Sequence, residues 1–228
     1  MKKILLFCTA VCILAACSST SDNKTSENKK DSTVIEQTPT SGKEVKLNVT
    51  EKKALDTFFS NFAEADLGSF TQTDGIKNEE MINFGILHNY INKRKVFVNV
   101  DENTIKIKKE YIEESVNKFF GKKSIKHKSI EGVAYSNGYY TMPLADGETF
   151  RFAQIAKLVD LGSQKFEAEV NLFSASSGWT GDTHADPSTY AKMDMGDAPS
   201  VDSKVKAILL KDEKGKYTLL EYTKQNIE

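Results

Sequence analysis

The chain has 228 residues, enough for one large domain or two small ones. Its formal net charge is -1 at pH 7, and its only arginines are Arg94 and Arg151. Because the lysines are spread along the chain and form no stripe, the sequence lacks the electrostatic footprint of a nucleic-acid-binding protein. We therefore expect no nucleic-acid partner.

The first sixteen residues have the pattern of a signal peptide. Lys2 and Lys3 give a positive start, and the apolar run from Ile4 to Ala16 is too short to cross a hydrocarbon core of about 30 Å as a helix. This pattern predicts that the protein is exported and that residues 1–16 are removed.

The segment ends in an apolar residue, two small residues and a cysteine: Leu14, Ala15, Ala16 and Cys17. These four residues resemble the lipobox of bacterial lipoproteins. The resemblance implies that a diacylglycerol is attached to the Cys17 sulfur, that the chain is cut just before Cys17, and that the new amino group is often acylated. The alternative is an ordinary secretory signal with a chance cysteine. Acyl chains on Cys17 predict anchoring at the cell membrane or outer membrane, facing outside the cytoplasm.

Cysteine usage agrees with the lipobox interpretation. The only cysteines are Cys8, Cys12 and Cys17, so cleavage before Cys17 leaves the mature body without a free thiol. A structural disulfide, a cysteine nucleophile and a zinc–thiolate site are thereby excluded.

Residues 17–45 are predicted to form the lipidated cysteine and a disordered tether. Ser18 to Glu44 contains almost no apolar residue, so it cannot bury enough surface to offset the entropy of ordering it. A recognition segment that folds on a partner is the alternative. The composition becomes globular at Lys46, and we expect one domain over residues 46–228.

Three helices are predicted in the first half of this domain. Asn48 and Glu51 have the spacing of a capping box, and an apolar stripe at helical spacing follows them. The second and third helices are expected at about Asn78 to Asn92 and Lys108 to Phe120, with Gly121 ending the third. The first stripe consists of Leu55, Phe58, Phe59 and Phe62.

Strands are predicted mainly in the second half. Asn137-Gly138 is a strong hairpin signal, because both turn positions need a positive φ. The segment Lys165 to Ala175 alternates apolar and polar residues, which predicts a sheet with one solvated face. The other expected strands are Lys95 to Val100, the hairpin arms within Val133 to Met142, Phe150 to Asp160, Val205 to Lys211 and Tyr217 to Tyr222.

Helices first and an antiparallel sheet afterwards predict an α+β fold. This element order resembles the cystatin-like or nuclear-transport-factor-like cone, in which N-terminal helices pack on a curved antiparallel sheet, although several other α+β folds share the order. The resemblance implies a pocket on the concave side of the sheet that hosts either a ligand or catalytic groups.

The sequence contains no G-x-S-x-G, H-E-x-x-H or G-x-G-x-x-G motif, so serine-hydrolase and nucleotide-binding interpretations lose support. The candidate bases are His88, His127 and His184. His88 lies at the edge of an apolar helix face, where packing is the simpler interpretation. His127 lies in the basic segment Lys122 to Lys128, which is either a solvated loop or a contact with anionic lipid head groups or an anionic partner near the membrane. We expect no cofactor.

The long connection from Ser176 to Ser200 is the main candidate site, since loops of this length are usually functional or disordered. Trp179 and Tyr190 are candidate contacts with a ligand or partner, together with Asp182 and His184. Asp182, His184 and Asp186 also resemble the start of a hard-cation loop, but the spacing of the residues that follow does not fit an EF-hand. No metal ligand is assigned, and a looser metal site is the alternative. The other interpretation is a lid that packs Trp179 onto the sheet edge.

These observations predict a lipid-anchored cell-envelope protein that acts as a non-catalytic ligand-binding or protein-interaction module. Its partners are the membrane, through Cys17, and an envelope ligand or protein that the sequence does not identify. The alternatives are an envelope hydrolase with a histidine and carboxylate site and a structural subunit of an envelope complex.

Overall fold

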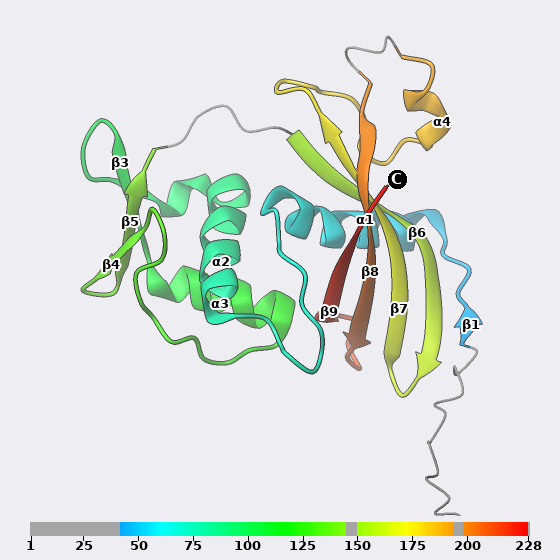
Figure 1. Ribbon diagram of the computed structural model, residues 1–228, viewed down its shortest axis with the longest axis horizontal. Helices are drawn as coiled ribbons and strands as arrows, with labels where there is room; N and C mark the ends of the chain where they lie inside the picture. The colour runs from blue at the N-terminus through cyan, green and yellow to red at the C-terminus, as the bar shows by residue number, and fades with distance from the viewer. Residues whose placement is uncertain (1–41, 145–149, 194–197, 228) are drawn as a thin grey trace, which may run out of the picture. The chain divides into compact units, whose positions relative to one another are not determined.

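The computed structural model describes residues 42–144, 150–193 and 198–227. The predicted signal peptide, Cys17 and nearly all of the tether lie outside the described residues. The described residues have an α+β fold with two antiparallel sheets (Figure 1). None of the helices in the described ranges is long and apolar enough to cross a membrane.

The larger sheet has five strands in the order β1-β6-β7-β8-β9. Each strand pairs antiparallel with its neighbour, and β6 to β9 follow one another along the chain as a meander. Ser163 and Gln164, which connect β6 and β7, both have positive φ, as a tight hairpin turn requires. The strands are β1 (Lys43–Glu44), β6 (Phe150–Gly162), β7 (Lys165–Ala175), β8 (Ser200–Lys211) and β9 (Tyr217–Asn226).

The smaller sheet has four strands in the order β2-β3-β5-β4. The predicted turn is confirmed, since Asn137 and Gly138 have φ values of 49° and 80°. The α+β fold is confirmed, but the strands form two antiparallel sheets and not one, because the hairpin pairs with Thr104–Lys108, which was not predicted as a strand. The strands are β2 (Val98–Asn99), β3 (Thr104–Lys108), β4 (Ala134–Ser136) and β5 (Tyr139–Pro143).

Three long helices lie where the apolar periodicity predicts them. The capping box is present: Asn48 Oδ1 accepts from the Glu51 amide at 2.9 Å, and Glu51 Oε2 accepts from the Asn48 amide at 2.9 Å. Gly121 ends the third helix with φ 63°. The helices are α1 (Val49–Glu64), α2 (Asn78–Asn92) and α3 (Lys109–Phe120), with a 3₁₀ turn η1 (Arg94–Val96) and a short α4 (Pro187–Tyr190).

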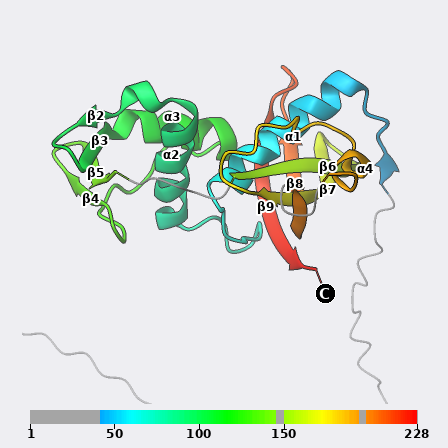
Figure 2. The same cartoon turned by 90° about the horizontal axis from the view of Figure 1, so that it is seen from above.

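Helix α1 lies across one face of the larger sheet (Figures 1 and 2). Leu55, Phe59 and Phe62 of its apolar stripe are at most 2% exposed. The Phe62 ring also contacts the rings of Phe84 on α2 and Phe119 on α3, at centroid distances of 5.4 and 5.5 Å. Each buried ring contributes roughly 1.5–3 kcal/mol, and together they join the helices and both sheets in one core.

Polar side chains of α1 accept hydrogen bonds from backbone amides of β6 that β1 leaves unpaired. β1 pairs only with Asp160 and Val159. Farther along β6, Asp56 Oδ1 accepts from the Ile155 amide at 2.7 Å, and Ser60 Oγ accepts from the Ala153 amide at 2.9 Å. The helix therefore blocks a sheet edge that would otherwise expose unpaired amides.

Candidate functional site

The loop after β7 packs on an aromatic cluster at the end of the larger sheet. The ring of Trp179 stacks on Phe152 with centroids 5.5 Å apart and planes 5° apart, and Phe152 stacks in turn on Phe173 at 4.9 Å. Gly181 lies so close to the indole that an added Cβ would overlap it. Trp179 therefore anchors the loop to the sheet, as the lid interpretation predicts.

A buried glutamine on β6 holds the backbone of this loop. Gln154, which is 3% exposed, places its Nε2 within hydrogen-bond distance of the Thr183 carbonyl (2.7 Å), the Ala185 carbonyl (2.9 Å) and the Tyr190 hydroxyl (3.1 Å). The Tyr190 hydroxyl donates to the Asp182 carbonyl at 2.7 Å. Burial, together with the negative charge of Asp182, raises the pKa of Tyr190 to about 12.

Asp182 and Asp186 of this loop bind its own backbone. Asp182 Oδ1 accepts from the His184 amide at 2.9 Å. Asp186 caps α4, because its Oδ1 accepts from the Ser188 amide at 2.8 Å and Pro187 occupies the first helical position. Within the ranges that the structure describes, no three histidine, cysteine or acidic side chains converge to hold a metal.

Two histidines pair with carboxylates. His184 Nδ1 lies 3.3 Å from Oδ2 of Asp56, whose side chain is 1% exposed and also accepts from Lys52 Nζ at 2.9 Å. His127 Nε2 lies 2.7 Å from Glu113 Oε1, and its Nδ1 lies 2.8 Å from the Tyr140 hydroxyl. Both arrangements bridge separate elements of the fold.

The third histidine is part of the core. His88 is 4% exposed and stacks on Phe84, with centroids 5.7 Å apart and planes 7° apart. Burial, with a smaller contribution from the charges of Lys118 and Lys93, lowers the pKa of His88 to about 4. The packing interpretation of this residue is confirmed.

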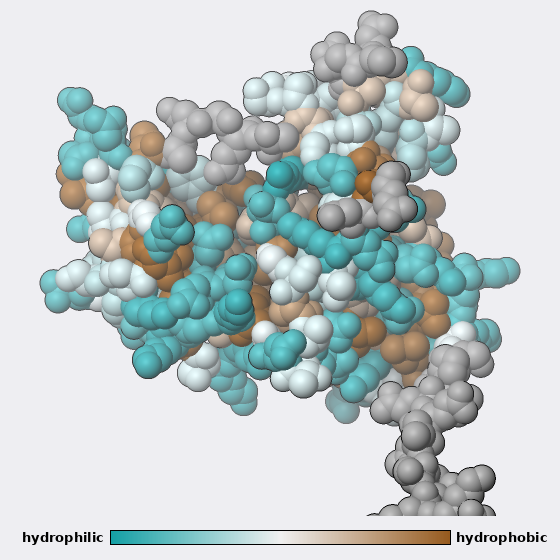
Figure 3. Space-filling view, viewed as in Figure 1, coloured by the Kyte–Doolittle hydropathy of each residue, from teal (hydrophilic) through white to brown (hydrophobic). Residues whose placement is uncertain are grey.

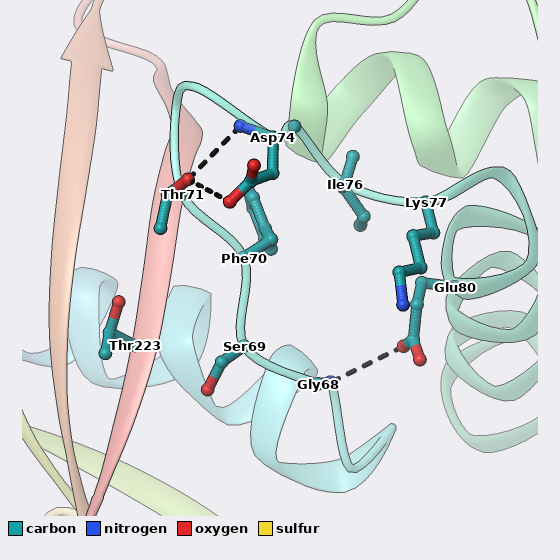
Figure 4. A pocket seen from close by; sticks show the side chains of 10 residues that line it. Gly68, Ser69, Phe70, Thr71, Asp74, Ile76, Lys77, Glu80 and Thr223 are labelled. Atoms are coloured by element: carbon teal, nitrogen blue, oxygen red, sulfur yellow. Dashed lines mark hydrogen bonds between the residues drawn. The ribbon is translucent and has the colours of Figure 1, made fainter.

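The largest of three described pockets lies away from the loop after β7. Its volume is about 360 Å³, and Figure 4 shows it between the segment Gly68–Lys77 and the start of α2. Glu80 of α2 and Thr223 of β9 complete the lining. Sequence reasoning missed this pocket, because its walls come from segments that are far apart in the chain.

Backbone pairing fixes the pocket segment to the edge of β9. The amides of Phe70 and Tyr222 each donate to the other residue's carbonyl, at 2.8 and 2.9 Å. A turn follows, in which the Gly75 amide donates to the Thr71 carbonyl at 2.8 Å and the Thr71 hydroxyl donates to Asp74 Oδ2 at 2.8 Å. Local contacts therefore hold the segment that forms this wall of the pocket.

Two smaller pockets are described. One, of about 210 Å³, shares Phe70, Gly75 and Ile76 with the first and is also lined by Phe120 of α3 and Leu219 of β9. The other, of about 250 Å³, is lined by charged side chains, among them Asp66 and Arg151. None of the three histidines and none of residues 176–193 lines any of these three pockets.

Comparison of the chain with protein-family models, with curated proteins and with solved structures gave no match.

Proposed function

We propose that the chain is an exported, lipid-anchored protein of the cell envelope that binds a small ligand without catalysing a reaction. The observation that carries this proposal is the pocket of about 360 Å³ between residues 68–77, Glu80 and Thr223. Ligand pockets usually have volumes of roughly 300–1,000 Å³ and combine apolar walls with a few polar groups.

The pocket walls differ in chemistry. Phe70 and Ile76 supply apolar surface, whereas Lys77 and Glu80 supply charged groups at the start of α2 (Figure 4). Glu80 receives one long hydrogen bond, from the Gly68 amide at 3.4 Å. Among the described residues, neither Lys77 nor Glu80 forms a salt bridge. These groups favour a small polar ligand with one apolar part, such as a sugar or a short peptide.

The hydrolase alternative has less support. It requires a histidine that faces a cleft beside a second polar group. His127 and His184 do pair with carboxylates, but these pairs lie outside the three described pockets. The lining of the Figure 4 pocket contains no histidine and no cysteine that could act as a nucleophile or base.

A protein-interaction surface is the second candidate function. Val98 and Val100 at the edge strand β2 are 54% and 52% exposed, and an exposed strand edge can pair with another chain. On the face that Figure 3 shows, however, hydrophobic residues form small separate patches among polar ones. The pocket is therefore the stronger candidate. Replacing Val98 and Val100 by threonine tests the surface: loss of co-purifying envelope protein supports it, and unchanged co-purification contradicts it.

The ligand proposal is tested by thermal shift on the full-length chain in detergent, with monosaccharides, short peptides and glycerophosphate as probes. One class is expected to raise the melting temperature. Glu80→Gln should weaken that binding roughly tenfold, as expected for losing a charged hydrogen-bond partner. Glu79→Gln is the matched control, because Glu79 precedes Glu80 on α2 but pairs with Lys128. No shift with any class, or equal weakening by both variants, would contradict the proposal.

The membrane attachment is tested separately. Cys17→Ser removes the only cysteine that remains after the predicted cleavage. The variant is expected to stay unprocessed or to leave the membrane fraction, with loss of the acyl mass from the mature chain. Unchanged fractionation and unchanged mass would refute lipid attachment and leave the ligand proposal intact.

A further inference from the structure

A charged pocket lies on the α1-covered face of the larger sheet, beyond the end of the helix. Its volume is about 250 Å³, and Ala63 and Leu172 contribute its apolar surface. Arg151 lies two residues before the buried Ala153 on β6, and Lys224 lies two residues after the buried Tyr222 on β9. Because side chains two apart share a face of a strand, both cations belong to the face that α1 covers.

One carboxylate oxygen holds these two cations together. Asp66 Oδ1 lies 2.8 Å from an Arg151 guanidinium nitrogen and 2.7 Å from Lys224 Nζ. A single acceptor atom therefore places both cations close enough for one anionic group to bridge them. Since two cations share one carboxylate, this side of the pocket keeps an excess positive charge.

The backbone at Asp66 is in a conformation that favours glycine. Its φ is 45°, in the left-handed region, directly after α1. The Leu67 amide there donates to the Phe62 carbonyl at 3.0 Å and closes the helix end. An aspartate tolerates this conformation better than most residues but still with some strain. The strained position presents the carboxylate that holds Arg151 and Lys224.

Arg151 has donor capacity to spare. Its Nε is buried and has no hydrogen-bond partner among the described residues, so a ligand can reach only the terminal nitrogens. A guanidinium carries five donors, and the contact with Asp66 uses one of its terminal nitrogens. The group can therefore take a further anionic acceptor without giving up Asp66.

On β8, between the strands of Arg151 and Lys224, the same pocket presents a carboxylate that no cation among the described residues neutralises. Asp202 accepts from the hydroxyl of Ser174 and from that of Ser203 at 3.0 Å. Both donors are neutral, and among the described residues Asp202 forms no salt bridge. The pocket therefore presents an unneutralised carboxylate as well as the two cations.

A β-bulge directs Asp202 toward this pocket. Leu172 pairs with Ser203, but Phe173 pairs with Val201, so the register skips Asp202. Bulges interrupt the alternation of side chains and occur often beside functional sites, where they re-aim a side chain. The irregular residue of β8 is thus also the one that supplies the negative group.

We propose that this pocket binds a small zwitterion of amino-acid size, with its carboxylate between Arg151 and Lys224 and its ammonium group at Asp202. A phosphate or a dicarboxylate fits less well, because additional negative charge would meet Asp66 and Asp202. The pocket shares no lining residue with the one in Figure 4. The proposal for this second site can therefore be tested independently of the proposed function.

Calorimetric titration of the full-length chain in detergent tests the proposal, with each free proteinogenic amino acid as a probe. Propionate and ethylamine serve as references for alanine, because each lacks one of its two charges, and phosphate serves as the simple anion. At least one amino acid is expected to bind, and neither propionate nor ethylamine is expected to bind as tightly. Failure of every amino acid to bind, or binding of propionate or phosphate as tight as that of the best amino acid, would overturn the proposal.

Substitutions locate the binding. Arg151→Gln is expected to weaken amino-acid binding roughly tenfold or more, as for a charged hydrogen bond. Arg94→Gln is the matched control, because the other arginine stacks on Tyr90 and lines none of the three described pockets. Equal affinities of these two variants would place the binding elsewhere and refute the assignment.

A second variant decides the matter if Arg151→Gln does not fold. Asp202→Asn keeps the size of an exposed side chain and removes only its charge. It is expected to abolish the preference for alanine over propionate, since the ammonium group loses its partner. A preference that persists in Asp202→Asn would contradict the proposed orientation, whereas Glu80→Gln should leave this binding unchanged.

Discussion

His184 on the loop after β7 and Asp56 on α1 are 128 residues apart in the chain, yet His184 Nδ1 lies 3.3 Å from Asp56 Oδ2. Asp56 also accepts from the Ile155 amide on β6. One buried carboxylate thus connects the helix, the sheet edge and the loop. Residues 176–193 of the loop after β7 are therefore a folded part of the domain, and their removal should affect stability.

Trp179→Ala tests the anchoring of this loop. The indole is partly buried and stacks on Phe152, so truncation should lower the free energy of unfolding by about 2–3 kcal/mol. Urea unfolding followed by circular dichroism measures the change. Thr180→Ala, at an exposed neighbouring position, is the control and should change stability little. A loss below about 0.5 kcal/mol for Trp179→Ala would show that the tryptophan does not hold the loop.

Gly181→Ala tests the close approach of the loop backbone to the indole. The added Cβ would overlap the Trp179 ring, so the ring must leave its place on Phe152 and become more exposed to water. Because Trp179 is the only tryptophan, the emission maximum of intrinsic fluorescence reports this directly and should shift to longer wavelength. The exposed Ser177→Ala is the control, and an unmoved maximum in Gly181→Ala contradicts the packing.

Because His88 is buried, the stability of the fold is expected to depend on pH. Its pKa is lowered from 6.5 to about 4 in the folded chain, first by burial, so unfolding takes up a proton as pH falls below 6.5. Stability should therefore decrease between about pH 6.5 and pH 4, by up to about 3 kcal/mol. His88→Phe keeps a ring against Phe84 and should flatten this part of the profile. Equal slopes in wild type and variant would contradict the assignment.

Asp66 predicts a change at lower pH. Burial opposes ionisation of this carboxyl, but its hydrogen bonds and charge interactions with Lys224 and Arg151 lower its pKa overall. The stabilisation is therefore present above the ordinary pKa of about 3.9 and is lost as pH falls through the lowered value. The stability difference between wild type and Asp66→Asn should shrink below about pH 4. The side chain is 64% exposed, so the stability difference should be below about 1 kcal/mol. A stability difference that grows below pH 4 would contradict the lowered pKa of Asp66.

Local signals in the sequence predicted much of the fold. The capping box at Asn48, the turn at Asn137-Gly138 and the end of α3 at Gly121 depend on neighbouring residues, and each is present. The strand β3 was missed because Thr104–Lys108 is short and contains two lysines. Its strand character depends on pairing with β5, more than thirty residues away, and no local pattern reports such a partner.

The candidate sites were less predictable. The loop after β7 stood out because its length and its aromatic residues are local properties, but its partners Phe152 and Gln154 lie on β6. Both pockets combine segments from opposite ends of the domain, such as Gly68 with Thr223 and Asp66 with Lys224. Such cavities follow from strand register and helix position, which periodicity alone does not fix.

Amide chemical-shift mapping tests the central claim most directly. The full-length chain in detergent is titrated with the probe class that raises its melting temperature, and the amide shifts are assigned to residues. We predict that the largest changes lie within Gly68–Lys77 and at Glu80 and Thr223, the lining of the pocket in Figure 4. Changes that instead cluster in residues 176–193, or the absence of any residue-specific change, would contradict binding in this pocket.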